Sequence, residues 1–296
     1  MKNEFLEEYA SSLRKEAKFR RPMRIVFDCS NGHVGLVIKE VLKGTKNIEA
    51  FYMNAKPDGD FPGHGPDPSK SEAMASLARE VTDRKADLGV IFDGDADRVV
   101  FVDDEGREID SDDLINFYCE NKRTRSIVVD LRVGWAVRER RGINIVRTKV
   151  GNYFIKRAMI ENRIDLGAER TGHYYFKIKG GYIDDPLRMA LAIISFISKT
   201  GAISLWVDEH KKTYRMKEEN ISVNDKEAAI KALTKAYARR KPQISDMDGL
   251  TMEFRDFWFN IRPSANENLL RINMEARTTR VLQKELEVLK SLIKTR

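Results

Sequence analysis

The stretch Leu88-Gly-Val-Ile-Phe92, Asp93-Gly-Asp95-Ala-Asp97-Arg98, Val99-Val-Phe-Val102 decides the fold of this chain. Two apolar runs flank a short polar segment, so the pattern predicts a strand, a tight loop and a second strand. Three aspartates stand at alternate positions of the loop, and their side chains can converge on one hard cation. Packing three carboxylates together is unfavourable unless a positive charge offsets them.

Magnesium is the natural occupant of such a loop because it prefers carboxylates and keeps room for water or a phosphate oxygen. The sequence therefore predicts Asp93, Asp95 and Asp97 as metal ligands. Arg98 follows directly, and its planar guanidinium suits phosphate. A polar hairpin with solvated aspartates is the alternative. A calcium loop does not fit, because the twelfth position, a bidentate Glu in such loops, is Asp104 here.

Composition bounds the class of protein. The 296 residues suggest two or three domains, and 42% hydrophobic with 33% charged residues indicates a globular chain. No apolar run reaches the roughly 20 residues of a membrane span, and the N-terminus lacks a signal peptide's apolar core. Only Cys29 and Cys119 occur, in different elements, which favours free thiols. We expect a cytoplasmic protein that does not bind membranes.

The net charge of +7 is spread along the chain. The short basic runs 138–141 and 239–241 fall at predicted helix ends, where the helix dipole favours cations. Because no RNA or DNA motif accompanies them, we expect no nucleic-acid binding. A binding site for anionic sugar phosphates would also use positive charge.

Strands and helices alternate from the N-terminus, which predicts α/β domains with mostly parallel sheets. Before the acidic loop we expect helices at 4–19, 34–43 and 70–84 and strands at 23–27, 48–52 and 88–92. After Asp110 the order restarts, with helices at 111–120, 133–141, 152–162 and 185–199 and strands at 126–130, 143–148 and 174–178. This second run of similar size and order suggests a structural duplication.

From Trp206 onward strands outnumber helices. We expect strands at 214–223, 249–254, 257–261 and 269–276, a helix at 225–239, and a last helix that follows the 269–276 strand and runs to the end. The predicted fold is therefore α/β: two tandem α/β domains with mixed or parallel sheets, residues 1–119 and 120–208, then a smaller α+β domain, residues 209–296.

Three further loops carry candidate functional residues. The loop 54–69 is rich in Pro, Gly and Asp, and loops of this length are usually functional or disordered. In the loop 167–173, Glu169 and Thr171 suit sugar hydroxyls and His173 suits proton transfer or phosphate, although an ordinary turn is the alternative.

The segment 262–268 has the ingredients of an anion site, because Arg262 can grip phosphate and Ser264 can donate a hydrogen bond. Pro-Ser turns are common, so this signal is weak alone. The turn 28–33 follows a strand and precedes a helix, and we interpret it as a glycine-assisted turn. His64 and His210 show no partner pattern, and we interpret them as surface or loop residues.

Taken together and in order, these loops resemble the α-D-phosphohexomutase family, which includes phosphoglucomutase, phosphomannomutase and phosphoglucosamine mutase. Asp93–Arg98 is similar to its magnesium loop, and 57–62 with 66–68 to the loop upstream of it. Gly167–His173 is similar to its sugar-specificity loop, and Arg262–Glu267 to its C-terminal phosphate loop. The resemblance covers nearly the whole chain from about Met23.

The resemblance implies an enzyme that interconverts hexose 1-phosphates and 6-phosphates through a phosphoserine, with a hexose 1,6-bisphosphate as intermediate and activator. It also implies roles for the site residues, in the following order. Mg²⁺ binds Asp93, Asp95 and Asp97, Arg98 contacts the phosphoserine, Glu169 and Thr171 hold sugar hydroxyls, and Arg262, Ser264 and Asn266 hold the non-reacting phosphate with help from His173.

Two positions depart from the family's pattern. Arg132 stands where the family often has a catalytic Lys, and Arg cannot deprotonate, which puts a role as base in doubt. Asn152 stands where many members have His, and it cannot act as an acid or base. The family's catalytic serine lies in a first domain, within T-A-S-H-N-P or similar, and these 296 residues contain no such motif.

Three hypotheses follow. In a split mutase, a separate polypeptide supplies the serine domain. In the second, the chain is a non-catalytic protein that binds Mg²⁺ and sugar phosphates. The third is a truncation. A neighbouring reading frame with an S-H-N-P domain, or a large exposed apolar patch for docking, would favour the first. A Glu–Thr pair tolerates several hydroxyl patterns, so the hexose stays open.

Overall fold

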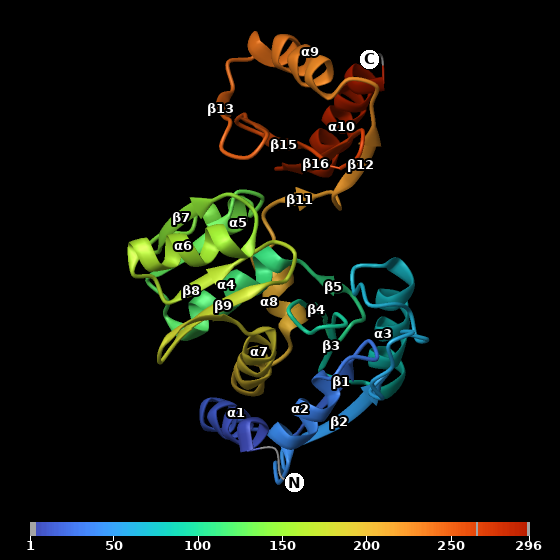
Figure 1. Cartoon of the computed structure of the whole chain (residues 1–296), viewed down its shortest axis with the longest axis vertical. Coiled ribbons are helices and arrows are strands. Elements are labelled where there is room, and N and C mark those ends of the chain that lie inside the picture. The colour runs from blue at the N-terminus through green and yellow to red at the C-terminus, as the bar shows by residue number, and fades with distance from the viewer. Residues whose placement is uncertain (1–3, 265, 295–296) are drawn as a thin grey trace.

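The computed structural model describes residues 4–264 and 266–294. The described residues form three sheets, of which the antiparallel one lies at one end of the longest axis of the molecule (Figure 1). Two mixed α/β units lie in the lower part of the view, and an antiparallel unit with two helices lies at the top. This arrangement confirms the predicted fold class.

The first sheet contains the acidic loop. Its strands run in the order β2-β1-β3-β4-β5 and have the bounds β1 (Met23–Asp28), β2 (Ile48–Met53), β3 (Leu88–Phe92), β4 (Val99–Val102) and β5 (Glu108–Ile109). β1 pairs with β2 and β3 in parallel, while β4 and β5 add in antiparallel fashion. All five residues of β3 are buried, as expected for a strand that helices cover on both faces.

The second sheet repeats this topology. It runs β7-β6-β8-β9-β10, with β6 (Ser126–Asp130), β7 (Asn144–Thr148), β8 (Leu166–Ala168), β9 (Tyr174–Ile178) and β10 (Gly181–Asp184). β6 pairs in parallel with β7 and β8, and β9 and β10 are antiparallel. Strand order and directions match those of the first sheet one for one, in agreement with a structural duplication.

Helices between the two sheets create one shared core. The helices of this region are α1 (Glu4–Glu16), α2 (Val34–Leu42), α3 (Ser71–Arg84), α4 (Ser111–Lys122), α5 (Trp135–Arg138), α6 (Asn152–Asn162), α7 (Pro186–Thr200) and α8 (Ile203–His210). One apolar cluster joins α1, α2, α4 and α7 to both sheets. α3 covers the outer face of the first sheet and α6 that of the second. The two α/β units therefore bury their inner faces together.

The third unit has its own core. Its sheet runs β11-β16-β15-β14-β13, with β12 also paired to β16. The bounds are β11 (Tyr214–Arg215), β12 (Glu219–Ser222), β13 (Gln243–Ser245), β14 (Leu250–Glu253), β15 (Phe257–Pro263) and β16 (Leu269–Ala276), with helices α9 (Lys226–Ala238) and α10 (Thr279–Lys294). A separate apolar cluster lies between this sheet and the two helices.

A few predicted elements differ from the structure. The helix expected at 133–141 is the single turn α5, which gives way to Gly142 at φ 80°. The strand expected at 214–223 is divided into β11 and β12. Tyr214 pairs with Ala276 but Glu219 with Ile272, so one extra residue forms a bulge between them. The short elements β5, β8, β10, β13 and α8 were not predicted.

Among the described residues, no single helix has the length and apolar character needed to cross a membrane. Of the described helices, only α7 and α8 taken together are long and apolar enough, and the two helices are bent by 90° relative to each other.

A cavity of about 310 Å³ lies where α4 meets the first sheet and the third unit. Asp113 of α4 lines this cavity beside Asp110, Asp112 and Lys211. Burial, followed by the charges of Asp110 and Asp112, raises the pKa of Asp113 to about 7. An unfolded Asp titrates near 4, so the folded chain holds this proton more tightly.

Replacing Asp113 with Asn therefore stabilises the protein in a pH-dependent way. As the pH rises from about 4 to about 7, the unfolded wild-type chain releases the Asp113 proton first, so the wild-type free energy of unfolding falls. The Asn variant has no such proton, and its free energy of unfolding does not fall for this reason. Above pH 7 we expect the variant to be about 2 kcal/mol more stable, since the helix N-terminus offsets part of the cost. Urea unfolding at pH 4, 6 and 8 measures this. The exposed Asp83→Asn is the control, and a gain that did not change with pH would contradict the prediction.

Candidate functional site

The acidic loop folds back on Asp93, the residue that follows β3. Asp93 is 2% exposed, and its Oδ1 accepts hydrogen bonds from the backbone N–H groups of Asp97 at 3.0 Å and Arg98 at 3.1 Å. Ala96 takes a left-handed conformation at φ 59°, which turns the chain. As a result, Asp93, Asp95 and Asp97 each place one carboxylate oxygen within 4.8 Å of the others.

The charges of this loop fit a divalent cation. Burial raises the pKa of Asp97 to about 6, and a hydrogen bond with Asp93 and the charges of Asp93 and Asp95 act in the same direction. The three carboxylates repel one another, and a bound Mg²⁺ would offset this repulsion while accepting their oxygens as ligands. Arg98 is the cation that the loop itself supplies, with its Nε 2.7 Å from Asp93 Oδ2.

The loop 167–173 is a tight hairpin between β8 and β9. The backbone N–H of Glu169 donates to His173 O at 2.9 Å, and that of Gly172 to Glu169 O at 3.1 Å. The Glu169 side chain is 4% exposed and accepts a hydrogen bond from the Tyr175 hydroxyl at 2.6 Å. Burial raises its pKa. Thr171 is exposed at the tip and makes no hydrogen bond within the described chain.

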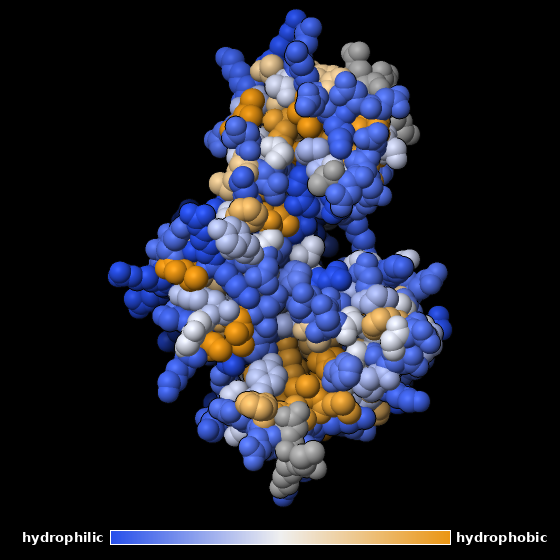
Figure 2. All heavy atoms as spheres, in the orientation of Figure 1, coloured by the Kyte–Doolittle hydropathy of each residue, from blue (hydrophilic) through white to orange (hydrophobic). Residues whose placement is uncertain are grey.

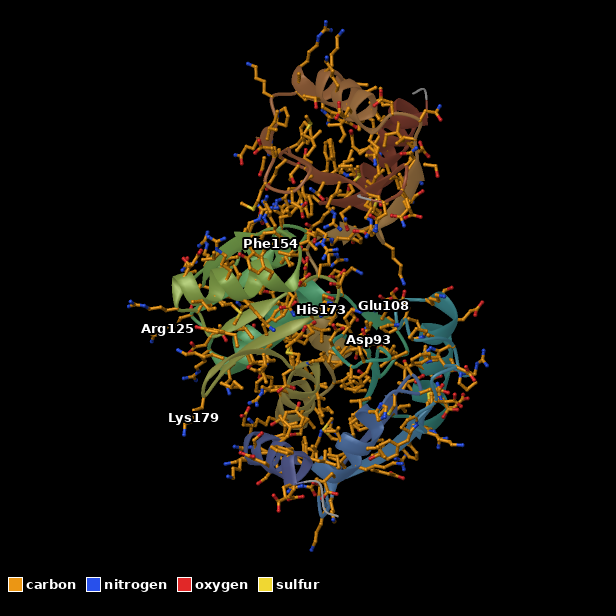
Figure 3. All side chains as sticks on the ribbon, in the orientation of Figure 1. Asp93, Glu108, Arg125, Phe154, His173 and Lys179 are labelled. Atoms are coloured by element: carbon orange, nitrogen blue, oxygen red, sulfur yellow. The ribbon has the colours of Figure 1, made fainter. Side chains whose placement is uncertain are left out.

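The structure brings the acidic loop and this hairpin into direct contact. The N–H of Val99 donates to Gly172 O at 3.0 Å, so the strand leaving the acidic loop pairs with the hairpin tip. The acidic loop joins β3 to β4, and the hairpin joins β8 to β9, which are equivalent positions in the two sheets. Figure 3 shows Asp93 and His173 close together in the middle of the molecule.

The side chain of His173, the last residue of the hairpin, faces the acidic loop. Its Nδ1 is 2.9 Å from Asp184 Oδ2 and 3.8 Å from Asp97 Oδ1. Burial alone would lower the pKa of His173, but the hydrogen bond and charge of Asp184, with Asp97 and Glu169 beyond, raise it. The imidazole is therefore held in one orientation and favours its charged form, which suits contact with a phosphate.

Arg132 occupies a buried position among carboxylates. It is 4% exposed and donates to both oxygens of Asp130, from Nε and Nη2 at 3.1 Å each. Nη2 is also 3.6 Å from Glu169, and Nη1 is 3.6 Å from Glu218. Burial alone would lower the pKa of Arg132, but Asp130 and the other carboxylates raise it, so the guanidinium stays charged. Because Arg132 stays charged and lies next to Glu169, it stabilises the hairpin and is not suited to proton transfer.

The predicted phosphate loop begins at the end of β15. Arg262 Nη1 is 3.4 Å from Asp248 Oδ2, and Ser264 is 6% exposed with its N–H on Leu269 O at 3.0 Å. Asn266 is exposed. Ala265, which falls within the loop, lies outside the described residues. In Figure 2 the surface is notched between the third unit and the unit that contains α3.

Sequence reasoning missed three residues at these loops. Lys226, the first residue of α9, donates from Nζ to the carbonyls of Ser264 at 2.9 Å and Glu267 at 3.2 Å. Asp184 orients His173 from β10, a strand that was not predicted. His64 does lie in a loop, but its side chain is only 6% exposed and pairs with Asp28. No local pattern marks these contacts, because in each the partner lies in another loop or strand.

Gly172 is required by the contact between the two loops. It has φ 94°, and a Cβ there would lie 2.5 Å from Val99 O. Gly180 has φ 100° and open space around it, so it is a matched control. We expect Gly180→Ala to lower the free energy of unfolding by about 1 kcal/mol and Gly172→Ala by about 2–4 kcal/mol. Urea unfolding compares the two, and equal losses would show that the contact is unimportant.

Comparisons with known sequences follow the same division of the chain. The sequence model of phosphoglucomutase/phosphomannomutase α/β/α domain II matches residues 3–106, and that of domain III matches residues 114–214. A phosphomannomutase of Methanocaldococcus jannaschii is 32% identical over 301 aligned residues, covering 99% of this chain and 66% of that protein. A probable phosphoglucosamine mutase of Methanopyrus kandleri is 33% identical, covering 86% and 58%.

Solved structures share the fold. A phosphoglucomutase/phosphomannomutase family protein of Burkholderia thailandensis superposes with a TM-score of 0.84 at 24% identity, over 98% of this chain and 64% of that one. The N-acetylphosphoglucosamine mutase of Aspergillus fumigatus, solved with GlcNAc-6P and magnesium, gives 0.66 at 15% identity, over 97% and 68%.

Two repeated α/β units followed by an α+β unit form the fold that this chain shares with these structures. The chain belongs to the phosphoglucomutase/phosphomannomutase family. It spans about two thirds or less of the length of the curated relatives described above.

Proposed function

We propose that this chain provides the metal, sugar and phosphate sites of a phosphohexomutase that interconverts hexose 1-phosphates and 6-phosphates. The observation that carries the proposal is the contact between Val99 and Gly172, which joins the acidic loop to the sugar hairpin. The reaction needs a phosphoryl group and a sugar hydroxyl side by side. These two loops are the parts that would hold them.

Each candidate residue then has a role. Asp93, Asp95 and Asp97 hold Mg²⁺, which supplies positive charge next to the transferring phosphoryl group. Arg98 adds a second cation there. Glu169 accepts hydrogen bonds from sugar hydroxyls, and exposed Thr171 both donates and accepts them. The remaining roles concern phosphate: His173 donates to it as a cation, and Arg262, Ser264 and Asn266 hold the phosphate that does not react.

The phosphoserine itself comes, in this proposal, from a serine domain that lies outside these 296 residues. The 296 residues contain no T-A-S-H-N-P or similar motif. Apolar residues gather on the surface in the lower middle of Figure 2, in the region where Figure 1 labels α2. Such an area is in keeping with a further domain packing there.

A coupled mutase assay tests the proposal. It uses glucose 1-phosphate and mannose 1-phosphate, Mg²⁺ and a trace of hexose 1,6-bisphosphate as activator, with and without a separately expressed serine domain from a relative. Turnover only when both proteins are present is the expected result. Turnover by these 296 residues alone would contradict the need for an added serine domain.

A non-catalytic Mg²⁺- and sugar-phosphate-binding protein is the second candidate. Arg132 favours it, since its guanidinium is fixed by Asp130 and cannot act as a base. Calorimetric binding of hexose phosphate without turnover in any mixture would support this candidate and reject the mutase.

A further inference from the structure

A buried carboxylate ends the first strand of each α/β unit. In the second unit, Asp130 ends β6, and its two oxygens accept from Arg132 and from the backbone N–H of Arg170 at 2.7 Å. Arg170 belongs to the sugar hairpin. The aspartate and its cation thus fix the hairpin to the end of β6.

Asp28 is the equivalent residue of the first unit. It ends β1, is fully buried, and accepts from the backbone N–H of Ser30 at 3.0 Å, as Asp130 accepts from that of Arg132. The side-chain nitrogens that contact the Asp28 carboxylate come from the loop 54–69: Asn54 Nδ2 at 3.0 and 3.1 Å, and His64 Nε2 at 3.0 Å. The His64 side chain therefore pairs with Asp28 as the Arg132 side chain pairs with Asp130 in the second unit.

The loop 54–69 in turn lies against the acidic loop. The N–H of Gly94 donates to Pro66 O at 3.1 Å, and Arg98 Nη1 is 3.6 Å from Asp67 Oδ1. A Cβ on Gly94 would lie 2.8 Å from the Phe61 ring and 3.0 Å from Pro66, so the two loops are packed closely. A shift of Pro66 and Asp67 would move Gly94 and Arg98 with it.

The backbone of this region is held in an unfavourable conformation. Ser30, Asn31, Asn54 and Phe61 all have φ between 45° and 55°, a range that residues other than glycine rarely adopt. Such conformations persist only where the surroundings over-determine them, and they cluster at functional sites. Four hydrogen bonds of Asn31 to the loop 54–69 contribute, between 2.8 and 3.1 Å.

We infer that His64 is a positioning residue for the metal loop. Its pairing with Asp28 anchors the loop 54–69, and through Pro66 and Asp67 this anchor holds Gly94 and Arg98 in place. Asp93, Asp95 and Asp97 are then pre-arranged for the cation. The inference rests on the metal site proposed above, and it adds to that site a histidine that touches none of the three aspartates.

The test removes the anchor without leaving a buried charge unpaired. The double variant Asp28→Asn/His64→Leu replaces both members of the pair, and His64→Gln keeps a donor near the position of Nε2. His33→Leu, a change of an exposed histidine in the neighbouring turn, is the matched control. Binding of Mn²⁺ is followed by electron paramagnetic resonance, and the Asp95→Asn chain defines binding outside the metal loop.

We expect the double variant to bind Mn²⁺ about tenfold more weakly, the size of effect typical of residues that support metal ligands. Its backbone amides at 57–68 and 93–98 should exchange hydrogen faster, while those of the second sheet stay unchanged. The chain with His64→Gln and the chain with His33→Leu should both behave as wild type.

Three results would overturn the inference. The first is a folded double variant with wild-type Mn²⁺ affinity. The second is failure of the double variant to fold, which would show that the pair supports the whole sheet. The third is unchanged exchange at 57–68. A wild-type chain that bound no Mn²⁺ at Asp95 would instead reject the metal site, and faster exchange would still show whether His64 anchors the loop.

Discussion

Replacing Arg132 with Met lowers the free energy of unfolding by about 3–5 kcal/mol, because it leaves buried carboxylates without their cation. Asp130 is fully buried and takes two hydrogen bonds from the guanidinium, and Glu169 is 4% exposed. Methionine has a similar length, so it leaves little cavity. The loss of stability therefore measures the removal of the positive charge. Urea unfolding followed by circular dichroism measures it.

Arg157 is the matched control for this prediction. It pairs with Glu161 at 2.7 Å on the surface of α6, with both side chains more than half exposed. Exposed ion pairs on a helix contribute little to stability, so Arg157→Met should change the free energy of unfolding only slightly. If both variants lost the same small amount, the buried carboxylates around Arg132 would have to be neutral in the folded protein, contrary to the charges inferred above.

A stability loss at Arg132 also bears on function. Arg132 lies within 3.6 Å of both Glu169 and Glu218 and so ties these two carboxylates to the end of β6. Arg132→Lys keeps the charge but not the two-nitrogen contact with Asp130, so an intermediate loss is expected. Arg132 therefore gives structural support to Glu169, the carboxylate to which we assign the sugar hydroxyls.

The sequence predicted the repeated α/β order because hydrophobic runs and turn residues are local signals. Most long elements, such as β3 and α6, lie where the pattern placed them. The elements that were missed or predicted too long are short: β10 has four residues and begins with Gly181, and α5 is a single turn. Elements this short take their conformation from tertiary contacts and carry little periodic signal.

The site was predicted as separate loops, and their meeting was not. Residues 93–98 and 169–173 are far apart in the chain, and the backbone contact between Val99 and Gly172 leaves no sequence pattern. The duplication supplies the missing reason, since both loops follow the third strand of equivalent sheets. The Asp28–His64 pair was invisible for the same reason, although Asp28 and Asp130 both end a first strand.

Replacing Asp95 with Asn lowers mutase turnover, measured with the serine domain present, by about 10²–10³-fold, the loss expected when one electrostatic contact to the transition state is removed. Mn²⁺ binding should weaken in parallel. Chelation of the wild-type mixture should abolish turnover, and excess Mg²⁺ should restore it. Asp60→Asn, at an exposed position of the neighbouring loop, should change neither rate nor binding.

Asp95 is the informative member of the three because its role is not mixed with folding. Asp93 already binds Arg98 and two backbone N–H groups, so its replacement would collapse the loop as well as remove a ligand. Asp97 lies 3.8 Å from His173, so its loss would also disturb the histidine. Asp95 is exposed and makes no hydrogen bond or ion pair within the described chain. Full turnover by Asp95→Asn would therefore contradict the metal role itself.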